Sequence, residues 1–288
     1  METRRFGRSG HRSSIAIFGG AAFHPLIDAA EAEEALDLAL AAGVNHYDFA
    51  ASYGAGMAET RLGPWLARHR RQVFVGTKTG RRDYGSAWAE INRSLALLRC
   101  EQLDLAQIHG VVDDDELDAA TGADGVLKAM QRARDEGLTR FVGITGHGLQ
   151  APRLFYEALE RFDFDSVLFP INPVLFGIAD YRWHAERLLA RCQERDVGVM
   201  AIKSIARGPW GDKGKRWHTW YEPWETQARI QQGVNFALSQ PGVTGIPMAG
   251  ETRLLPMLLQ AAEGFTPLSH AEQEALIAAS AGLEPIFA

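Results

Sequence analysis

Eight short apolar segments follow one another along the chain at intervals of roughly thirty residues, and this repetition limits the folds open to it. The segments are rich in β-branched and aromatic residues, which is typical of strands buried on both faces. They span residues 14–19, 44–48, 73–78, 103–109, 141–145, 166–171, 197–203 and 243–247. A strand that returns at this interval leaves room for one helix before the next strand, so the pattern predicts repeated β/α units.

Helical patterns occupy the intervals between the apolar segments. In segment 30–43 apolar residues recur at spacings of three and four, and Gly43 supplies a C-terminal stop. Segments 86–100 and 125–137 show the same spacing. Alternation of this kind predicts helices that pack against a parallel sheet.

The number of units and the length of the chain favour one closed barrel. With 288 residues, the chain has the length of an α/β barrel, which commonly exceeds ~250 residues as one unit. We therefore expect a (β/α)8 TIM barrel formed by a single domain over residues 1–288, with insertions after the fourth and seventh strands and an extra C-terminal helix near 269–281. The main alternative is a doubly wound sheet, but the segment after the first strand, IFGGAAFHP, lacks the GxGxxG spacing of a nucleotide-binding Rossmann fold.

Composition excludes several classes of protein. The net charge of −6 is spread along the chain without a basic stripe, so we expect no nucleic-acid partner. The sequence has no run of about 18 consecutive apolar residues, so no membrane span is predicted. The cysteines Cys100 and Cys192 are too few for a disulfide framework and form no CxxC metal motif, which favours the reducing cytoplasm and no metal centre. No segment indicates the oligomeric state.

Polar residues gather where the predicted strands end. Asp48 ends the second strand, Lys78 the third and His109 the fourth, and Tyr53 lies in the loop after Asp48. Catalytic groups in α/β barrels come from the C-terminal ends of several strands. A lysine at a buried strand end needs a counter-charge, and Asp48 on the neighbouring strand is the natural partner. We therefore expect Asp48, Tyr53, Lys78 and His109 to form one catalytic site.

The chemistry available to these four residues is proton transfer to a developing alkoxide. Free tyrosine has a pKa near ~10, so the expected role of Lys78 is to lower the pKa of Tyr53 while Asp48 holds the ammonium group. A neutral His109 would donate a hydrogen bond to a substrate carbonyl. No side chain can donate a hydride, so the reaction implies a nicotinamide cofactor.

Three segments resemble the signature segments of the aldo-keto reductases: DFAASYGAGMAETRLG (48–63), FVGTKTG (74–80) and LDLAQIHG (103–110). RRFGRSG (4–10) resembles the N-terminal β-hairpin of that family. The resemblance implies a reversible reduction of a small ketone or aldehyde to an alcohol, with Tyr53 as general acid/base. It also implies NADPH bound extended across the barrel mouth without a Rossmann fold.

The segments that hold the cofactor in this family depart from its common pattern. In GITGHG the residue available for a cofactor contact is Thr145, and His147 could either contact the cofactor or stabilise a turn. SVLFPIN keeps Asn172 but has Leu168 in place of the usual glutamine. Segment 199–208 replaces a stacking tyrosine and offers Lys203, Arg207 and Gly208, while PMAGETRLLP offers only Arg253 for a 2′-phosphate. We expect these residues, Thr145, Asn172, Lys203, Arg207, Gly208 and Arg253, to contact NADPH, with NADH as the alternative.

Other interpretations of the same residues remain open. Each member of the tetrad taken singly has a structural explanation, such as helix capping for Asp48 or packing for Tyr53. One alternative function is a non-catalytic, nicotinamide-binding regulatory subunit, and another is a cofactor-free lyase or isomerase with Lys78 as a Schiff-base amine. The tryptophan-rich segment 210–224 either lines a substrate pocket or packs an insertion onto the barrel.

Overall fold

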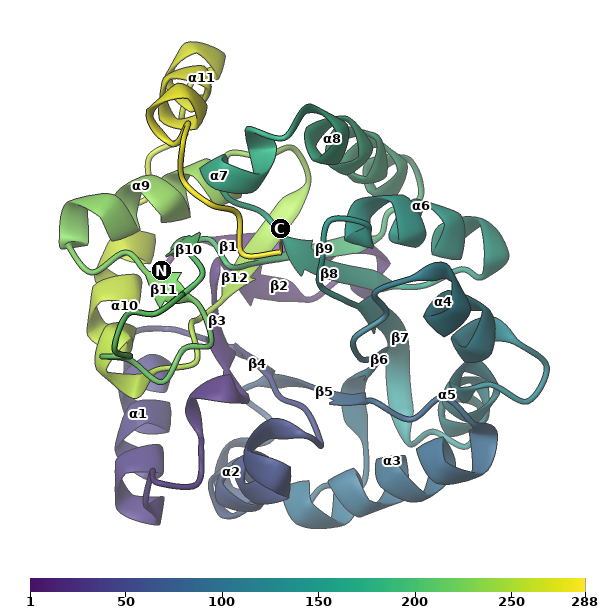
Figure 1. The fold of residues 1–288 in the computed structure, drawn as a ribbon. Coiled ribbons are helices and arrows are strands. Elements are labelled where there is room, and N and C mark those ends of the chain that lie inside the picture. The colour runs from purple at the N-terminus through teal and green to yellow at the C-terminus, as the bar shows by residue number, and fades with distance from the viewer. Residues whose placement is uncertain (288) are drawn as a thin grey trace.

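Eight parallel strands close into a barrel in the structure, a computed structural model that describes residues 1–287. Figure 1 looks down the barrel axis and shows the strands inside a ring of helices. Each strand pairs with its neighbours along the chain, and β12 closes the barrel by pairing with both β9 and β3. The barrel strands are β3 (Ala16–Gly19), β4 (His46–Asp48), β5 (Phe74–Thr79), β6 (Leu103–Ile108), β7 (Thr139–Thr145), β8 (Ser166–Pro170), β9 (Gly198–Ile202) and β12 (Val243–Pro247). The predicted (β/α)8 fold is confirmed.

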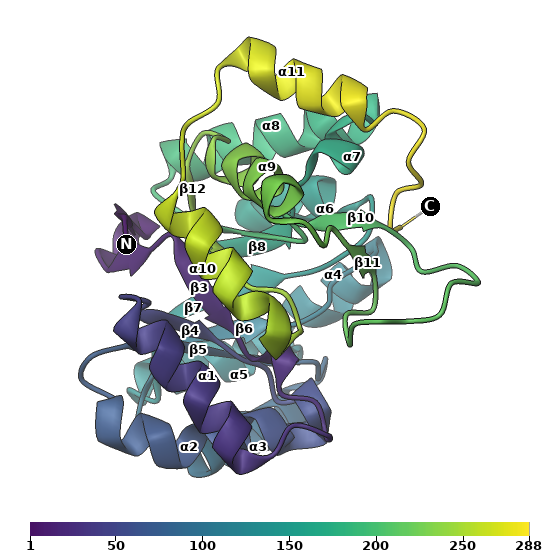
Figure 2. The ribbon, with the colours of Figure 1, turned by 90° about the vertical axis from the view of Figure 1, so that its left-hand side faces the viewer.

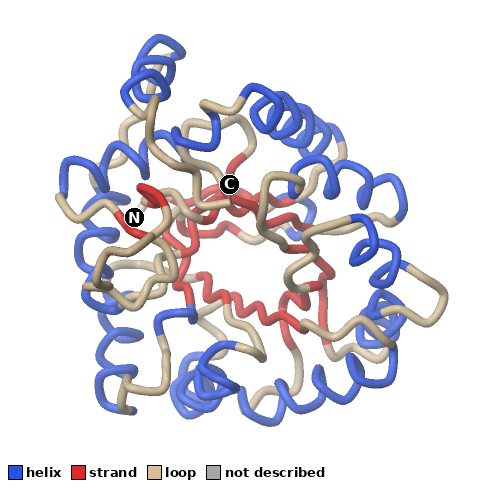
Figure 3. The backbone as a smooth tube through the Cα atoms, viewed as in Figure 1, coloured by secondary structure: helices blue, strands red, loops and turns tan. Residues whose placement is uncertain are grey.

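Helices surround the barrel and cover the outer face of every strand (Figure 3). Side-chain caps fix several of their starts: the carboxylate of Asp28 accepts from the Glu31 amide at the start of α1, and Asp83 caps α3 in the same way. The helices are α1 (Ala29–Ala41), α2 (Met57–His69), α3 (Tyr84–Leu98), α4 (Asp114–Thr121), α5 (Val126–Asp135), α6 (Ala151–Arg161), α7 (Pro173–Phe176), α8 (Ala179–Glu194), α9 (Gln227–Leu238), α10 (Leu255–Glu263) and α11 (His270–Ala279).

An antiparallel hairpin closes one end of the barrel. Its strands are β1 (Thr3–Arg5) and β2 (Arg12–Ser14), so the first barrel strand begins at Ala16 rather than at Ser14. The hairpin places Phe6 at the start of β9, where a Cβ on Gly198 would lie only 2.4 Å from the Phe6 ring. In Figure 2 the hairpin and the C-terminus lie at opposite ends of the barrel. The hairpin therefore forms the base, and the mouth lies at the C-terminal ends of the strands.

Apolar side chains fill the barrel interior below the mouth. Phe6 packs there with residues from five barrel strands: Ile17, Phe74, Leu105, Leu168, Met200 and Ile202. A second and larger apolar cluster lies between the strands and the surrounding helices. Because the interior is filled, polar side chains at the strand ends lie on an apolar floor that excludes water from below.

Both predicted insertions and the extra helix are present. After β6 the chain forms α4 before α5, and after β9 it forms a small antiparallel pair, β10 (Ala206–Gly208) and β11 (Glu222–Pro223), before α9. The final helix, α11, lies outside the barrel, and the residues after it return to the mouth (Figure 1). No helix within residues 1–287 is long and apolar enough to cross a membrane.

Candidate active site

Three of the predicted catalytic residues form a chain of contacts at the mouth. The Lys78 ammonium group donates to Asp48 Oδ2 over 2.5 Å and to the Phe49 carbonyl over 2.7 Å. Its Nζ also lies 3.4 Å from the Tyr53 hydroxyl oxygen. The fourth residue, His109, packs edge-on against the Tyr53 ring, with 5.6 Å between ring centroids. The structure thus brings all four predicted residues together.

Strand register explains why residues so far apart in sequence meet. In the barrel Asp48 lies opposite Gly76, and Lys78 lies opposite Gln107. The Ala51 amide extends this pairing by donating to the Lys78 carbonyl over 3.0 Å, which holds the loop before Tyr53 against β5. The C-terminal residues of the parallel strands β4, β5 and β6 therefore lie at the same end of the barrel, and the loop after β4 lies beside Lys78.

The segment that carries Tyr53 has an unusual backbone. Gly54, Ala55 and Gly56 all have positive φ, at 55°, 55° and 93°. A Cβ at Gly54 would lie 2.6 Å from the Phe23 carbonyl, so glycine is required there by space as well as by conformation. Ala55 has no such freedom and costs about 1 kcal/mol in the left-handed region. This turn carries the chain from Tyr53 directly into α2 and fixes the phenol over the cavity.

Gln107 is part of the site and was not among the predicted residues. Its side-chain amide donates to Asp48 Oδ1 over 2.8 Å, so the two Asp48 oxygens are held by Gln107 and Lys78. A signal was available, because Gln107 precedes His109 by two residues and side chains two apart on a strand share a face. A polar residue at that position on a buried strand points into the barrel.

Burial and the neighbouring charges set the protonation of the lysine and the tyrosine. Burial opposes the charge on Lys78, but Asp48 and Tyr53 outweigh it, so the pKa of Lys78 is raised and the amine stays cationic. For Tyr53 the largest effect is burial, which raises the pKa of the phenol above its ordinary value, while Lys78 acts to lower it. Lys78 thus acts on Tyr53 in the predicted direction, but the loss of hydration exceeds its effect and the net shift of the Tyr53 pKa is upward.

His109 is neutral in this environment. Burial lowers its pKa well below the ordinary value, and the cation on Lys78 lowers it further. Its Nδ1 lies 3.4 Å from the Ser52 hydroxyl oxygen. A neutral imidazole in this place can donate one hydrogen bond to an acceptor in the cavity without adding a charge.

A cavity of about 110 Å³ opens above the tetrad, and two predicted cofactor residues line it. These are Thr145, at the end of β7, and Lys203, directly after β9. Thr145 Oγ1 is fully buried and has no hydrogen-bond partner within residues 1–287, and the same holds for Nδ1 of His147. Unpartnered buried polar atoms at a cavity wall mark where a ligand can bind.

The other four predicted cofactor residues lie away from this cavity. Asn172 caps α7 and donates to the Lys203 carbonyl over 3.1 Å. Arg207 and Gly208 lie on β10, where the Arg207 guanidinium group binds the carboxylate of Glu222 over 2.5 Å. Arg253 lies after β12 and binds Glu251 over 2.8 Å, with its side chain 58% exposed.

The tryptophan-rich segment divides between packing and the cavity. Trp210 is buried, and its indole N–H donates to the Thr219 carbonyl over 2.7 Å. Trp220 and Tyr221 line the cavity, and Trp220 also packs against Phe287 from the end of the chain, with 5.4 Å between ring centroids. Segment 210–224 therefore both packs onto the barrel and lines the cavity.

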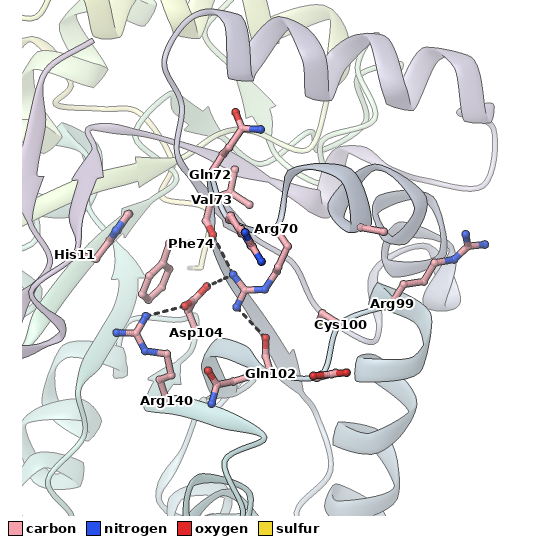
Figure 4. Close-up of a pocket in the computed structure, with 13 residues that line it drawn as sticks. His11, Arg70, Gln72, Val73, Phe74, Arg99, Cys100, Gln102, Asp104 and Arg140 are labelled. Atoms are coloured by element: carbon pink, nitrogen blue, oxygen red, sulfur yellow. Dashed lines mark hydrogen bonds and ion pairs between the residues drawn. The ribbon is translucent and has the colours of Figure 1, made fainter.

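A larger cavity, of about 830 Å³, opens at the opposite end of the barrel (Figure 4). Asp104 lies at its centre and binds the guanidinium groups of Arg70 and Arg140, over 2.9 Å and 3.1 Å. This cavity lies at the N-terminal ends of the strands, where residues in barrels serve stability, and the tetrad is at the other end. Within residues 1–287, no cluster of three or more metal-ligating side chains occurs in either place.

Comparison with known proteins agrees with the fold and shows the family. The sequence profile described as the aldo/keto reductase family matches residues 16–219. This chain belongs to the aldo/keto reductase family. It is 28% identical to L-galactose dehydrogenase of Arabidopsis thaliana over 235 residues, which are 76% of this chain and 70% of that protein.

Solved structures of aldo-keto reductases share the fold. The holo form of an aldo-keto reductase from Bacillus halodurans superposes with a TM-score of 0.73 at 21% identity, covering 99% of this chain and 98% of that one. An aldo-keto reductase from Klebsiella pneumoniae in complex with NADPH gives a TM-score of 0.71 at 19% identity, covering 97% of this chain and 95% of that one. At these identities the likeness concerns the architecture.

Proposed function

We propose that this aldo/keto reductase catalyses the reversible, NAD(P)H-dependent reduction of a ketone or aldehyde to an alcohol, with Tyr53 as the proton donor. The observation that carries the proposal is the contact chain from Asp48 through Lys78 to the Tyr53 hydroxyl, beside a neutral His109 and under one cavity. This is a set of groups matched to proton transfer at a carbonyl oxygen.

Each residue has a separate task in this reaction. The substrate carbonyl oxygen accepts hydrogen bonds from the Tyr53 hydroxyl and from the imidazole of His109. When bound, the cofactor supplies the hydride that no side chain can provide. As negative charge develops on the oxygen, Tyr53 gives up its proton, and the Lys78 cation stabilises the tyrosinate that remains. Asp48, held by Gln107, keeps the lysine charged and oriented.

The cavity has unpartnered polar atoms that the carboxamide group of a nicotinamide cofactor could bind. Thr145 Oγ1 and His147 Nδ1 are buried on the wall of the cavity, without partners among residues 1–287. A carboxamide group could satisfy both, because it offers donors and an acceptor. Among the predicted contacts outside the cavity, Asn172 would act indirectly through the Lys203 backbone. Arg207 and Gly208 lie on β10 and do not line the cavity, so their contact with the cofactor stays a prediction.

Discrimination between NADPH and NADH would depend on Arg253. Its guanidinium group is exposed and binds only one carboxylate, that of Glu251, within residues 1–287. Capture of a 2′-phosphate would require Arg253 to share or exchange that partner. We also infer a cytoplasmic location, since Cys100 and Cys192 are both free.

The experiment that tests this function compares the wild-type protein with Tyr53→Phe. We expect wild-type protein to oxidise NADPH in the presence of a panel of aldehydes and ketones. Tyr53→Phe should lose activity by about 10²–10⁴-fold while binding NADPH with unchanged affinity, measured by quenching of the tryptophan fluorescence. Unchanged turnover by Tyr53→Phe would contradict the assignment of the proton donor.

The same experiment separates the alternative functions. A non-catalytic regulatory subunit would bind NADPH but turn over no carbonyl compound even as the wild-type protein. A Schiff-base enzyme would be trapped covalently at Lys78 by borohydride in the presence of substrate. The short ion pair with Asp48 disfavours that route, because it keeps the amine protonated and therefore not nucleophilic.

A further inference from the structure

Lys203 is a second lysine in the catalytic cavity, and it is not paired with a carboxylate among residues 1–287. Its side chain contacts two aromatic rings: Nζ lies 4.2 Å from the ring centre of Trp220 and 5.4 Å from that of Tyr221. It makes no hydrogen bond or ion pair with any side chain or carbonyl in the described part of the chain. Lys78, in the same cavity, has both a carboxylate and a carbonyl as acceptors.

The position of Lys203 is held at a cost. Its backbone has φ 65°, in the left-handed region that a lysine adopts at about 1 kcal/mol or more. Two donors keep it there, because its carbonyl accepts from the Asn172 side chain over 3.1 Å and from the Ala206 amide over 3.0 Å. Burial, and then the Lys78 cation, lower the pKa of Lys203 to about 7. The side chain of Lys203 is half-buried, and its amine has no counter-ion among residues 1–287, so a ligand can supply the missing anion.

We propose that Lys203 binds a carboxylate carried by the substrate, so that the preferred substrates are aldehyde acids or keto acids. The proposal rests on the proposed reductase function and deepens it. Lys203 and the proton donor Tyr53 line the same cavity, so one substrate can contact Lys203 with its carboxylate and Tyr53 with its carbonyl oxygen. The one carboxylate that lines the cavity within residues 1–287 is Asp48, and both of its oxygens are already bound.

The other groups around Lys203 reinforce this preference. His147 is neutral, because burial lowers its pKa to about 3, so it adds no competing cation and can act as a further hydrogen-bonding partner. The Lys78 charge is balanced by Asp48. The titratable side chains that line the cavity with Lys203 are Asp48, Tyr53, Lys78, His109, His147, His218 and Tyr221. Among the lysines of this cavity, Lys78 is paired with Asp48, and Lys203 has no bound anion within residues 1–287.

The test uses pairs of substrates that differ only in the charge. Phenylglyoxylate is compared with methyl phenylglyoxylate, and 4-carboxybenzaldehyde with methyl 4-formylbenzoate. The quantity measured is the ratio of kcat/KM for the acid to that for its ester. It is compared in the wild type, Lys203→Met, Lys203→Arg and the control Lys215→Met, whose lysine is exposed in the loop between β10 and β11. We expect the ratio to fall by about tenfold or more in Lys203→Met, to be largely kept in Lys203→Arg, and to equal the wild-type ratio in Lys215→Met.

The pH dependence provides a second readout. The pKa of Lys203 is lowered, so its cation is present below about pH 7 and is lost as the pH rises through that value. The wild-type acid-to-ester ratio should therefore decline above about pH 7, since kcat/KM reports the free enzyme. In Lys203→Met the ratio should be low and flat over the same range, which a purely structural role of Lys203 would not produce.

Binding of the product distinguishes failure of this proposal from failure of the reductase function. Calorimetry with mandelate and methyl mandelate needs no turnover, and we expect the wild type in the presence of NADPH to bind mandelate at least about tenfold more tightly than Lys203→Met does. Equal mandelate affinity in the two proteins, or an acid-to-ester ratio that Lys203→Met leaves unchanged, would overturn the proposal. The proposal would also be overturned if Lys203→Met changed only the affinity for NADPH, because the lysine would then bind a cofactor phosphate.

Discussion

The two ends of the barrel use charged side chains in opposite ways. At the base, Asp104 binds Arg70 and Arg140 and also accepts from the Val75 amide over 2.8 Å, so its oxygens are satisfied within the fold (Figure 4). At the mouth, Thr145 Oγ1 has no partner among residues 1–287, and the Lys203 amine faces only aromatic rings. Unpartnered buried polar atoms occur at both ends, because Nε2 of His11 on the lining of the larger cavity also has no partner among residues 1–287. The ends differ in their charged groups: the carboxylate of Asp104 is neutralised within the fold, whereas the amine of Lys203 has no counter-ion there.

The Lys78–Asp48 pair differs from the other polar groups at the mouth, because it is buried and its charges neutralise each other. Removing this pair should have the largest effect on stability and on activity. Lys78→Met leaves Asp48 buried with only Gln107 as a donor. We expect the free energy of unfolding to fall by about 3–5 kcal/mol and carbonyl reduction to be lost. Urea denaturation measures the first effect, and NADPH oxidation by the folded variant measures the second. A Lys78→Met protein as stable as the wild type would show that the pair is not structurally coupled.

The equivalent change at the base should affect stability alone. Asp104→Asn removes the charge shared by Arg70 and Arg140 and weakens the acceptor of the Val75 amide. We expect a loss of about 1–3 kcal/mol in the free energy of unfolding, with kcat/KM within about twofold of the wild type. Urea denaturation and steady-state kinetics on the same preparation decide this. A large loss of activity in the fully folded variant would mean that the two ends are coupled.

Two threonines on β7 make a sharper version of the comparison. Thr145→Val, at the mouth, removes a hydroxyl group that has no partner among residues 1–287, so stability should stay within about 0.5 kcal/mol while NADPH affinity falls by roughly two- to tenfold. The matched control Thr139→Val, at the base, removes a hydroxyl group that donates to the Phe141 carbonyl over 3.0 Å. The control should lose about 1 kcal/mol of stability and no NADPH affinity. Fluorescence titration measures the NADPH affinity and urea denaturation measures the stability. A loss of NADPH affinity in Thr139→Val but not in Thr145→Val would contradict the comparison.

The smallest expected effect is on the pH profile of a neutral substrate. Reduction needs a protonated Tyr53, and burial raises the pKa of the phenol, so the proton is retained throughout the neutral range. With an uncharged aldehyde, kcat/KM should therefore change by less than about twofold between roughly pH 6 and pH 9 and decline only at higher pH. A decline centred near neutrality would indicate that Lys78 dominates over burial and that the Tyr53 pKa is lowered after all.

Much of this arrangement could be predicted from local sequence patterns. Strand spacing is a property of the chain itself, and the residues at the strand ends share one edge in any parallel barrel, so the amino-acid sequence suffices to place Asp48, Lys78 and His109 together. Arg207 could not be placed in this way, because its partner Glu222 reaches it through the pairing of β10 with β11. The direction of the Tyr53 pKa shift was also beyond prediction, since it depends on how far burial outweighs one cation.

The most direct test of the account follows one hydrogen atom. A single turnover of an aldehyde with NADPH deuterated at the transferable C4 position should place the deuterium on the carbinol carbon of the alcohol in the wild type. In Tyr53→Phe, with NADPH bound to the same extent, the transfer should be slower by about 10²–10⁴-fold. Deuterium that appears on the alcohol at the wild-type rate in Tyr53→Phe, or that never appears on it in the wild type, would contradict the proposed reaction.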